Sequence, residues 1–573
     1  MENSKVNSTE PRIGVFVCHC GVNIGGVVDV PKVVEYAKTL PGVVYAEENL
    51  YTCSEEGLSK IKGAIREYGL NRVVVASCTP RTHEPLFRSA CEDAGLNQYL
   101  FEMANIREQC SWVHSHEPEK ATEKAKDIVR MTVAKARLLE PEEEAEIAVA
   151  DSALIVGAGI TGMTTAVSLA RQGFRIYLVE KEPEVGGLVR RLNALYPTMS
   201  DPAEILNPLI EQVKSSRNIQ LLTSTGVTSV RGYVGNFEVT ALRGKTEELK
   251  LNVGTIVVAT GAEAFDPEGR YGYRRLAGVI TQLQLERMLR DGELGKPKSV
   301  VMIQCVGSRE EGRPYCSRIC CMNAIKNALI IKEKSPETDV CILYRDIQAY
   351  GRNYEDYYKK AREAGVIFIM YDKDKPPEVS RSGIRLKVSV VNAFMHQEVT
   401  LGADMVVLST PLVQHESGRD LARVLRVPLG SDGFFMEAHA KLRPVDFATD
   451  GIFVCGTAQS PKNIPESIAQ AYGAASKAGI LMASGKVRAE AITAMVNEEI
   501  CRGCGRCEEV CEFNAIGVED TGGAKMTAKV MEAICKGCGV CAVACPTGAI
   551  TMRHFTTKQI NAMLEAALTP GRG

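Results

Sequence analysis

Eight cysteines near the C-terminal end of the chain repeat one spacing twice. In each run, two residues separate the first three cysteines and three residues precede the fourth. The runs are Cys501, Cys504, Cys507 and Cys511, followed by Cys535, Cys538, Cys541 and Cys545. Thiolates at this spacing bind [4Fe–4S] clusters, and the fourth cysteine of each run serves the other cluster. We therefore expect one cluster on Cys501, Cys504, Cys507 and Cys545, and a second on Cys535, Cys538, Cys541 and Cys511.

Structural zinc is the alternative, because Cys-x2-Cys pairs also bind zinc. The three-residue step before the fourth cysteine favours iron–sulfur clusters, as does Pro546 after Cys545, since zinc sites need neither. The first run differs from the second in having Glu512 where the second has this proline.

A glycine motif indicates a dinucleotide site. A predicted strand at 153–156 leads into Gly157, Gly159 and Gly162, which open a predicted helix at 163–172. Glu180 ends the next strand, with Lys181 after it. Such glycines let a pyrophosphate approach the helix N-terminus, and the acidic residue accepts the ribose hydroxyls. The alternative is a dinucleotide fold without a cofactor.

Three later features favour FAD over NAD. Gly187 completes a glycine doublet after Glu180, Thr260 and Gly261 end a predicted strand at 255–259, and Gly456 and Thr457 close a later strand. All three resemble motifs of FAD proteins, although relatives carry aspartate at the position of Thr457. The arrangement resembles thioredoxin-reductase-like flavoproteins, in which a second dinucleotide domain follows the Thr-Gly strand. No Cys-x-x-Cys pair is present in this unit to support the thioredoxin-reductase reaction.

The turn where that second domain would cradle phosphate contains cysteines instead of a glycine motif. A predicted strand at 299–304 is followed by Cys305, Cys316, Cys320 and Cys321. Thiols gathered on one strand-to-helix turn are interpreted as ligands of a further cluster, with buried structural cysteines as the alternative. We expect Arg309, Arg313 and Arg318 to surround this site and to stabilise the charge of the reduced flavin or cluster. Cys341 and Cys455 are expected in the cores of their strands.

Five N-terminal cysteines have no compact spacing, but their positions follow predicted strands. Strands are expected at 13–17, 43–47, 72–76 and 99–103, with helices between them. The carboxyl ends of parallel strands meet at one edge, where ligands bind. We therefore expect a cluster on Cys20, Cys53, Cys78 and Cys110, with Cys18 as an alternative ligand; the competing interpretation is a purely structural module. The nearby histidines are expected to be surface or hydrogen-bonding residues: His19, His83, His114 and His116.

The 573 residues therefore divide into five predicted segments. These are a parallel α/β domain (1–116), a linker helix (117–150), a FAD domain with the cysteine-rich site at 305–321 (151–490), an α+β two-cluster ferredoxin domain of bacterial type (491–555), and a tail helix (556–573). The 68 basic and 70 acidic residues nearly balance, so no nucleic-acid partner is indicated. The polar start at 1–11 and the lack of a long apolar run predict a cytoplasmic protein without a transmembrane segment.

These motifs together resemble the HdrA family, the iron–sulfur flavoproteins of heterodisulfide reductase. The marks are Val17-Cys-His-Cys-Gly21, Asn71-Arg-Val-Val-Val-Ala-Ser-Cys-Thr-Pro80, Ala104-Asn-Ile-Arg107, Cys305-Val-Gly-Ser-Arg309 and Tyr315-Cys-Ser-Arg-Ile-Cys-Cys321. Some relatives carry an extra ferredoxin insert in the flavin domain. Here 235–251 is a short hairpin-like stretch without cysteine, so the insert is absent, and Met199–Glu204 also lacks cysteines that some relatives have nearby.

The resemblance implies an oxidoreductase component that performs flavin-based electron bifurcation. Its implied partners are heterodisulfide-reductase B- and C-like subunits, a hydrogenase- or dehydrogenase-type donor, and soluble ferredoxin, with a homodimer at the centre of the complex. Two other functions remain open: a relay that links donor to acceptor without splitting electron pairs, and a stand-alone NAD(P)H flavoenzyme. The missing second glycine motif argues against the last.

Overall fold

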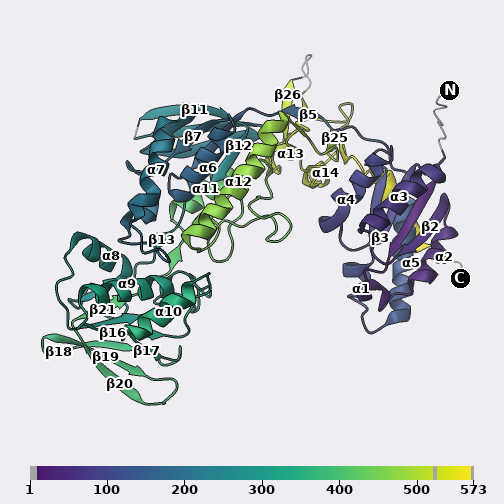
Figure 1. Cartoon of the computed structure of the whole chain (residues 1–573). Coiled ribbons are helices and arrows are strands. Elements are labelled where there is room, and N and C mark those ends of the chain that lie inside the picture. The colour runs from purple at the N-terminus through teal and green to yellow at the C-terminus, as the bar shows by residue number, and fades with distance from the viewer. Residues whose placement is uncertain (1–9, 245, 521–525, 570–573) are drawn as a thin grey trace. The chain divides into compact units, whose positions relative to one another are not determined.

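The computed structural model describes residues 10–569, except 245 and 521–525 (Figure 1). Most of the polar N-terminal stretch and the final residues 570–573 therefore lie outside the described residues. By its internal contacts the chain forms two compact units. The first comprises 1–146 with 488–573, and the second comprises 147–487. Each unit contains part of the expected cofactor machinery.

The N-terminal part of the first unit is a four-stranded parallel sheet in the order β2-β1-β3-β4. Its strands are β1 (Ile13–Cys18), β2 (Val43–Asn49), β3 (Arg72–Ser77) and β4 (Phe101–Asn105). Its helices are α1 (Val22–Gly25), α2 (Val30–Lys38), α3 (Glu55–Glu67), α4 (Pro80–Asp93), η1 (Arg107–Ser111) and α5 (Pro118–Ala136). Every residue of β1 is buried, as expected for a parallel strand covered on both faces. Helix α4 begins at Pro80, because proline suits the first turn of a helix.

The C-terminal part of the first unit contains the two cysteine runs. Two antiparallel strand pairs form it, β25 (Ala494–Val496) with β28 (Ile550–Met552) and β26 (Ile516–Asp520) with β27 (Met526–Val530). Two one-turn helices, α13 (Arg506–Glu509) and α14 (Val540–Ala544), lie within the cysteine runs. The tail helix α15 (Thr557–Leu568) packs on α5, where Gln559 Nε2 donates to the Leu138 carbonyl at 2.9 Å. Arg130 of α5 in turn donates to the Ala566 carbonyl at 2.8 Å, so this tail is part of the folded unit.

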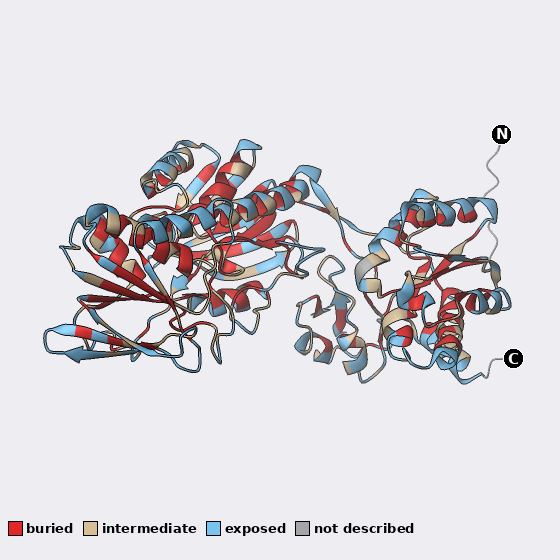
Figure 2. Ribbon diagram, turned by 60° about the horizontal axis from the view of Figure 1, so that its bottom comes forward, coloured by how far each residue is buried: buried red, intermediate tan, exposed pale blue. Residues whose placement is uncertain are grey.

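The second unit is built on two parallel five-stranded sheets. The first has the order β23-β12-β6-β7-β8 and the second β14-β21-β15-β16-β17. The first sheet comprises β6 (Ser152–Val156), β7 (Arg175–Val179), β8 (Ile219–Leu222), β12 (Thr255–Val258) and β23 (Ile452–Val454). The second comprises β14 (Val279–Thr281), β15 (Ser299–Ile303), β16 (Asp339–Tyr344), β17 (Ile367–Met370) and β21 (Met405–Leu408). Most residues of these strands are buried, and Figure 2 shows buried strands as the red core of the ribbon.

Helices and two antiparallel layers complete the second unit. The helices are α6 (Ile160–Arg171), α7 (Pro202–Ser215), α8 (Gln282–Asp291), α9 (Cys320–Lys334), α10 (Tyr354–Glu363), α11 (Ser417–Leu425) and α12 (Ile464–Ser484), with short turns η2 (Gly187–Arg191) and η3 (Gly456–Ala458). The layers are β9 (Thr225–Tyr233), β10 (Asn236–Arg243) and β11 (Glu247–Val253), and β18 (Glu378–Ser382), β19 (Arg385–Val391) and β20 (Glu398–Ala403). The second unit also contains a two-stranded antiparallel pair, β13 (Glu263–Ala264) with β22 (Leu412–Val413). The stretch expected as a hairpin at 235–251 pairs as β10 with β11.

A buried ion pair connects the two sheets of this unit. Lys326 of α9 and Glu286 of α8 form a salt bridge in which neither side chain is exposed to solvent. Lys326 Nζ also donates to the Ala194 carbonyl at 2.8 Å, and Glu286 Oε2 accepts from the Asn193 backbone N–H at 2.8 Å. A buried charge is tolerated only when such partners satisfy it. The pair therefore fixes both helices to the segment that follows η2.

Removing one member of this pair should leave the other charge buried and unpaired. We expect Lys326→Met to lower the free energy of unfolding by about 3–5 kcal/mol, and Lys326→Met/Glu286→Leu to recover most of the loss. Denaturant unfolding followed by circular dichroism measures both. The matched control is Lys359→Met, since Lys359 pairs with Glu363 at 3.9 Å on the surface, and a change there should stay below about 1 kcal/mol. Equal losses in Lys326→Met and Lys359→Met would contradict the assignment.

Candidate cofactor sites

The dinucleotide loop lies between β6 and α6, at the point where the strand order of the first sheet reverses. Gly157 has φ +106°, and a Cβ there would lie 2.4 Å from the Ala259 carbonyl oxygen. A Cβ at Gly162 would lie 1.8 Å from the Gly157 oxygen, so this helix packs too closely for any side chain. Gly159 is different, because its Cβ would meet nothing within 4 Å. It caps the N-terminus of α6 and leaves open space there for a pyrophosphate.

Glu180 is held in the position expected for a ribose-binding carboxylate. It is buried at the end of β7, where Oε2 accepts from the Ala158 N–H at 2.7 Å and Oε1 accepts from the Glu182 N–H at 3.0 Å. Each carboxylate oxygen can still accept a further hydrogen bond. The next residue, Lys181, is exposed. Its charge acts on His415, whose pKa is lowered first by burial and then by Lys181.

The other FAD-motif residues belong to separate segments of the chain but lie close to the same loop. Gly186 forms a backbone bridge with Gly159, and a Cβ on Gly187 would lie 3.3 Å from the Gly159 Cα. A Cβ on Gly261 would lie 3.7 Å from Thr457 Oγ1. At Gly456, φ is +70° and a Cβ would lie 2.5 Å from Thr161 Oγ1. This convergence of glycines around one loop fits the shape that FAD requires.

An unsatisfied hydroxyl marks the same place. Thr260 Oγ1 is buried and has no hydrogen-bond partner among the described residues. Unpaired buried polar atoms are uncommon in folded proteins, and a bound ligand can supply the missing partner. The hydroxyl lies in the Thr-Gly pair that ends β12, so a bound FAD is the partner that fits it.

Lys462 also lies in this region, although no sequence motif predicted that it would. Its ammonium is buried and donates to the Gly456 carbonyl at 2.7 Å and to the Ser460 carbonyl at 2.8 Å. Burial lowers the pKa of Lys462 to about 8. Lys462 thus fixes the turn that contains Gly456 and Thr457. Its ammonium also places a cationic group beside that turn.

The open space at Gly159 yields a test of the flavin site. We expect Gly159→Ala to fold normally, because its Cβ meets no protein atom, but to bind FAD at least about tenfold more weakly, because the methyl group would occupy the space of the pyrophosphate. The flavin-to-protein ratio after gel filtration measures this. Gly226→Ala is the matched control, since a Cβ there also meets nothing within 4 Å. Full FAD content in Gly159→Ala would refute the placement.

The four central cysteines converge around the start of α9. Cys305 follows β15 with a left-handed backbone (φ +61°), a strained conformation for a residue that is not glycine. Cys320 and Cys321 form the first turn of α9. Burial raises the pKa of Cys320, and the proximity of Cys321, Cys305 and Cys316 raises it further. Four thiols that oppose one another's ionisation are suited to a metal cluster, which deprotonates its ligands.

The arginines expected at this site meet the prediction in part: Arg309 lies by Cys305, and the Arg318 backbone N–H donates to Cys316 Sγ at 3.3 Å. Burial raises the pKa of Cys305, while Arg345 and Arg309 oppose that rise. Arg313 instead pairs with Glu310 at 3.2 Å, and the side chain of Arg318 pairs with Glu466 at 2.7 Å. Arg345 follows β16, the strand next to β15, and nothing local in the sequence linked it to Cys305. Cys341 is buried within β16, as predicted, and Cys455 is buried in the core immediately after β23.

The two ferredoxin cysteine runs line two small cavities. The first cavity is lined by Cys501, Cys504, Cys507 and Cys545, together with Pro546. The second is lined by Cys511, Cys535, Cys538 and Cys541. Each cavity thus takes three cysteines from one run and the fourth from the other. Backbone N–H groups point at the sulfurs, including Ala528 N to Cys501 Sγ at 3.4 Å and Ala515 N to Cys511 Sγ at 3.2 Å.

Each cavity is lined by four cysteines, the number of ligands that a [4Fe–4S] cluster takes. Among the described residues, no three His, Cys, Asp or Glu side chains lie close enough together to hold one metal ion. A tetrahedral zinc would bring its thiolates within about 3.8 Å of one another, given Zn–S bonds of about 2.3 Å. A four-iron cubane spaces its cysteines around a larger body, and cysteine-lined cavities are consistent with that arrangement.

At the edge of the N-terminal sheet, the structure groups Cys18 rather than Cys110 with the other cysteines. Cys18 Sγ accepts from the Cys20 N–H at 3.3 Å, and Arg107 Nη1 lies 3.2 Å from Cys20 Sγ. The pKa of Cys53 is raised by burial and then by Cys18. That of Cys78 is raised by burial, against the opposing charge of Arg107.

Cys110, which the strand pattern placed in the ligand set, lies elsewhere. Its Sγ is buried and donates to the Ala121 carbonyl of α5 at 3.0 Å. The π-helical turn η1 rotates it into the core beneath α5. Two nearby histidines make hydrogen bonds, as expected: His19 to Glu48 at 3.2 Å and His114 to Glu117 at 3.3 Å.

The fold and these sites define an oxidoreductase of the iron–sulfur flavoprotein class. Residues 151–303 match the pyridine nucleotide-disulphide oxidoreductase family, and residues 500–549 match the 4Fe-4S dicluster domain family. The chain is similar to the solved structure of a thioredoxin reductase from T. acidophilum, with a TM-score of 0.42 and 19% identity, over 58% of this chain and 97% of that one. No helix among the described residues is both long and apolar enough to cross a membrane.

Full-length relatives give the family. The chain is 43% identical to the A-type subunit of the H(2):CoB-CoM heterodisulfide,ferredoxin reductase of Methanothermobacter thermautotrophicus, over 99% of both chains. It is also 43% identical to the second A-type iron-sulfur subunit of the CoB--CoM heterodisulfide reductase of Methanopyrus kandleri, over 97% of this chain and 99% of that one. The chain belongs to the HdrA family, the A-type subunits of heterodisulfide reductase. The first alignment spans 661 positions against 573 residues here, so that relative has residues that this chain lacks.

Proposed function

We propose that this chain carries electrons between partner subunits through four [4Fe–4S] clusters and FAD, and that it bifurcates electron pairs at the flavin. Cavities lined by cysteines from both ferredoxin runs carry this proposal, because they match the ligand exchange of two-cluster ferredoxins. FAD accepts and releases electrons singly or in pairs, which lets it join two-electron chemistry to one-electron clusters. The protein positions these carriers and sets their electrostatics.

The proposed ligand sets follow the geometry. The ferredoxin clusters use the two sets that line the cavities. The third cluster uses Cys305, Cys316, Cys320 and Cys321. The fourth uses Cys18, Cys20, Cys53 and Cys78, and Cys110 is left as a core residue. FAD is held by Gly157, Gly159, Gly162, Glu180, Lys181, Gly187, Thr260, Gly261, Gly456 and Thr457.

The proposed partners are heterodisulfide-reductase B- and C-like subunits, with a hydrogenase- or dehydrogenase-type donor and soluble ferredoxin, around a homodimer in the cytoplasm. Relatives whose names include H(2), heterodisulfide and ferredoxin support a hydrogen-linked donor and these two acceptors. Direct reduction by NAD(P)H is not proposed, since the turn after β15 carries Cys305 where a phosphate-binding glycine motif would be needed.

Iron analysis distinguishes the proposed N-terminal ligands. We expect about sixteen iron atoms per wild-type chain and about twelve in Cys78→Ala, at four per cluster. Cys110→Ala is the matched control and should keep the wild-type iron content, because its thiol faces α5. Loss of iron in Cys110→Ala, or full iron in Cys78→Ala, would overturn this ligand set.

Bifurcation and simple relay differ in how the two acceptors depend on each other. With the assembled complex, we expect reduction of the low-potential acceptor to stop when the high-potential acceptor is withheld, because the favourable transfer must drive the unfavourable one. Ferredoxin reduction, followed optically with and without the heterodisulfide, measures this. Ferredoxin reduction that proceeds equally well alone identifies the relay function instead.

A further inference from the structure

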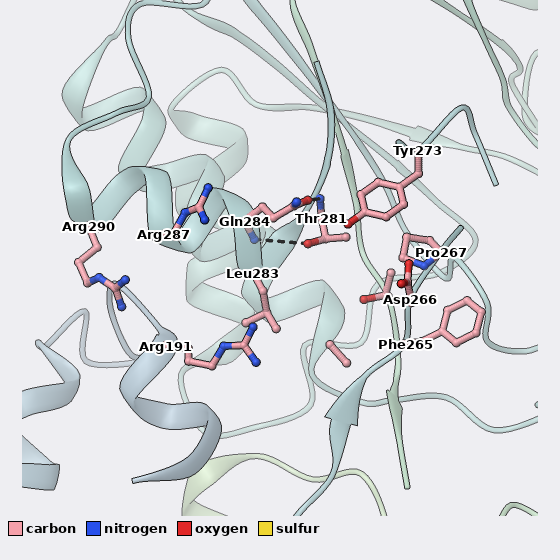
Figure 3. A pocket seen from close by; sticks show the side chains of 12 residues that line it. Arg191, Phe265, Asp266, Pro267, Tyr273, Thr281, Leu283, Gln284, Arg287 and Arg290 are labelled. Carbon is pink, nitrogen blue, oxygen red and sulfur yellow. Dashed lines mark hydrogen bonds between the residues drawn. The ribbon is translucent and has the colours of Figure 1, made fainter. Parts of the chain in front are cut away.

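A cavity of about 320 Å³ opens at the carboxyl end of β14, beside the first turn of α8 (Figure 3). It is lined by Arg191, Ala264, Phe265, Asp266, Pro267, Tyr273, Thr281, Leu283, Gln284, Arg287, Arg290 and Thr410. None of these residues is a cysteine or a glycine of the FAD motifs, but two border those sites: the Thr410 carbonyl accepts from Cys320 Sγ at 3.4 Å, and Arg191 ends the turn η2 that begins at Gly187. Thr281 ends β14 and Thr410 follows β21, so the cavity lies at the edge where parallel sheets bind ligands.

One side of the cavity is cationic. Figure 3 shows Arg191, Arg287 and Arg290 on the same side of the opening. Arg290 pairs with Asp291 at 3.1 Å, but Arg191 and Arg287 have no ion pair among the described residues. The acidic lining residue, Asp266, is neutralised by Arg274 at 2.6 Å. The cavity therefore presents two uncompensated guanidinium groups, which suit a phosphate because they can bind it in bidentate fashion.

The opposite side is aromatic and apolar. The half-buried ring of Tyr273 faces the cavity across from the arginines, with Pro267 beside it (Figure 3). Between the two sides, Gln284 uses its Oε1 to accept from the Thr281 N–H at 2.8 Å. Its amide nitrogen has no partner among the described residues and remains available as a donor. A planar ring beside Tyr273 and an anion at the arginines would use both sides at once.

We propose that this cavity binds a nucleotide, with its phosphate groups against Arg191 and Arg287 and its base beside Tyr273. The volume lies at the lower end of the range for small-ligand pockets, about 300–1,000 Å³. The site is separate from the turn after β15, so it does not restore the missing phosphate-binding motif. This proposal is independent of electron bifurcation, since none of its residues is among the proposed cluster ligands or FAD-motif residues.

Calorimetric titration of the full-length, FAD-saturated protein with ADP and with pyrophosphate tests the proposal. Saturation with FAD prevents ADP from entering the flavin site. We expect saturable ADP binding that weakens at least about tenfold in Arg191→Glu and in Arg287→Glu. Arg217→Glu is the matched control, because Arg217 is exposed in the same unit but outside the cavity, and it should bind like the wild type. Tyr273→Ala should weaken ADP binding several-fold and leave pyrophosphate binding unchanged.

Three results would overturn the proposal. The first is no saturable ADP binding by the wild-type protein whose FAD content is complete. The second is an equal loss of binding in Arg217→Glu, which would indicate a general charge effect. The third is pyrophosphate binding as tight as ADP binding with neither affected by Tyr273→Ala, which would leave an anion site and remove the base from the assignment. Circular dichroism of each variant verifies that it is folded.

Discussion

The buried ion pair between Lys326 and Glu286 is the constraint that links the two halves of the flavoprotein unit. Lys326 lies on α9, the helix whose first turn contains Cys320 and Cys321, and Glu286 lies on α8. Both charges also bind the backbone of the segment after η2, which follows the Gly186–Gly187 doublet. None of these elements can move away without leaving a desolvated charge behind, a cost of several kcal/mol. This one ion pair therefore fixes the position of α9, the helix that begins with Cys320 and Cys321, relative to the flavin loop.

The three kinds of cysteine site balance the charge of their thiolates by different means. Burial raises the pKa of at least one thiol at each kind of site, Cys53, Cys320 and Cys541 among them, so each site needs groups that favour the ionised form. The ferredoxin sulfurs receive backbone N–H groups such as that of Ala528. Cys305 instead has the guanidinium groups of Arg345 and Arg309 nearby, and Cys20 has Arg107. Hydrogen bonding and net charge around the sulfurs set cluster potentials, so these different surroundings provide the means to place the clusters at different potentials.

Local sequence patterns predicted the sites that local geometry determines. The ferredoxin spacing anticipated both cavities, and the glycine loop with Glu180 anticipated the flavin cradle, because each depends on residues close in sequence or on one strand-turn-helix unit. The choice between Cys18 and Cys110 depended on how η1 turns under α5, which strand order alone does not determine. Arg345 and Lys462 were missed for the same reason. Each reaches its site from a neighbouring strand or turn, and the sequence does not encode that proximity in a motif.

The second parallel sheet has cysteines at the edge where such sheets bind nucleotides, which is consistent with the proposed third cluster. Its strand order reverses between β15 and β21, the point where such sheets bind phosphate at the N-terminus of the following helix. Here β15 leads into Cys305, and the helix that follows, α9, starts with Cys320 and Cys321 and has no side-chain cap at its N-terminus. The partial positive charge of a helix N-terminus favours any anion, whether a phosphate or a thiolate cluster. With cysteines in place of glycines, this edge of the sheet would bind a different ligand. The partial positive charge of the helix N-terminus would still favour that ligand.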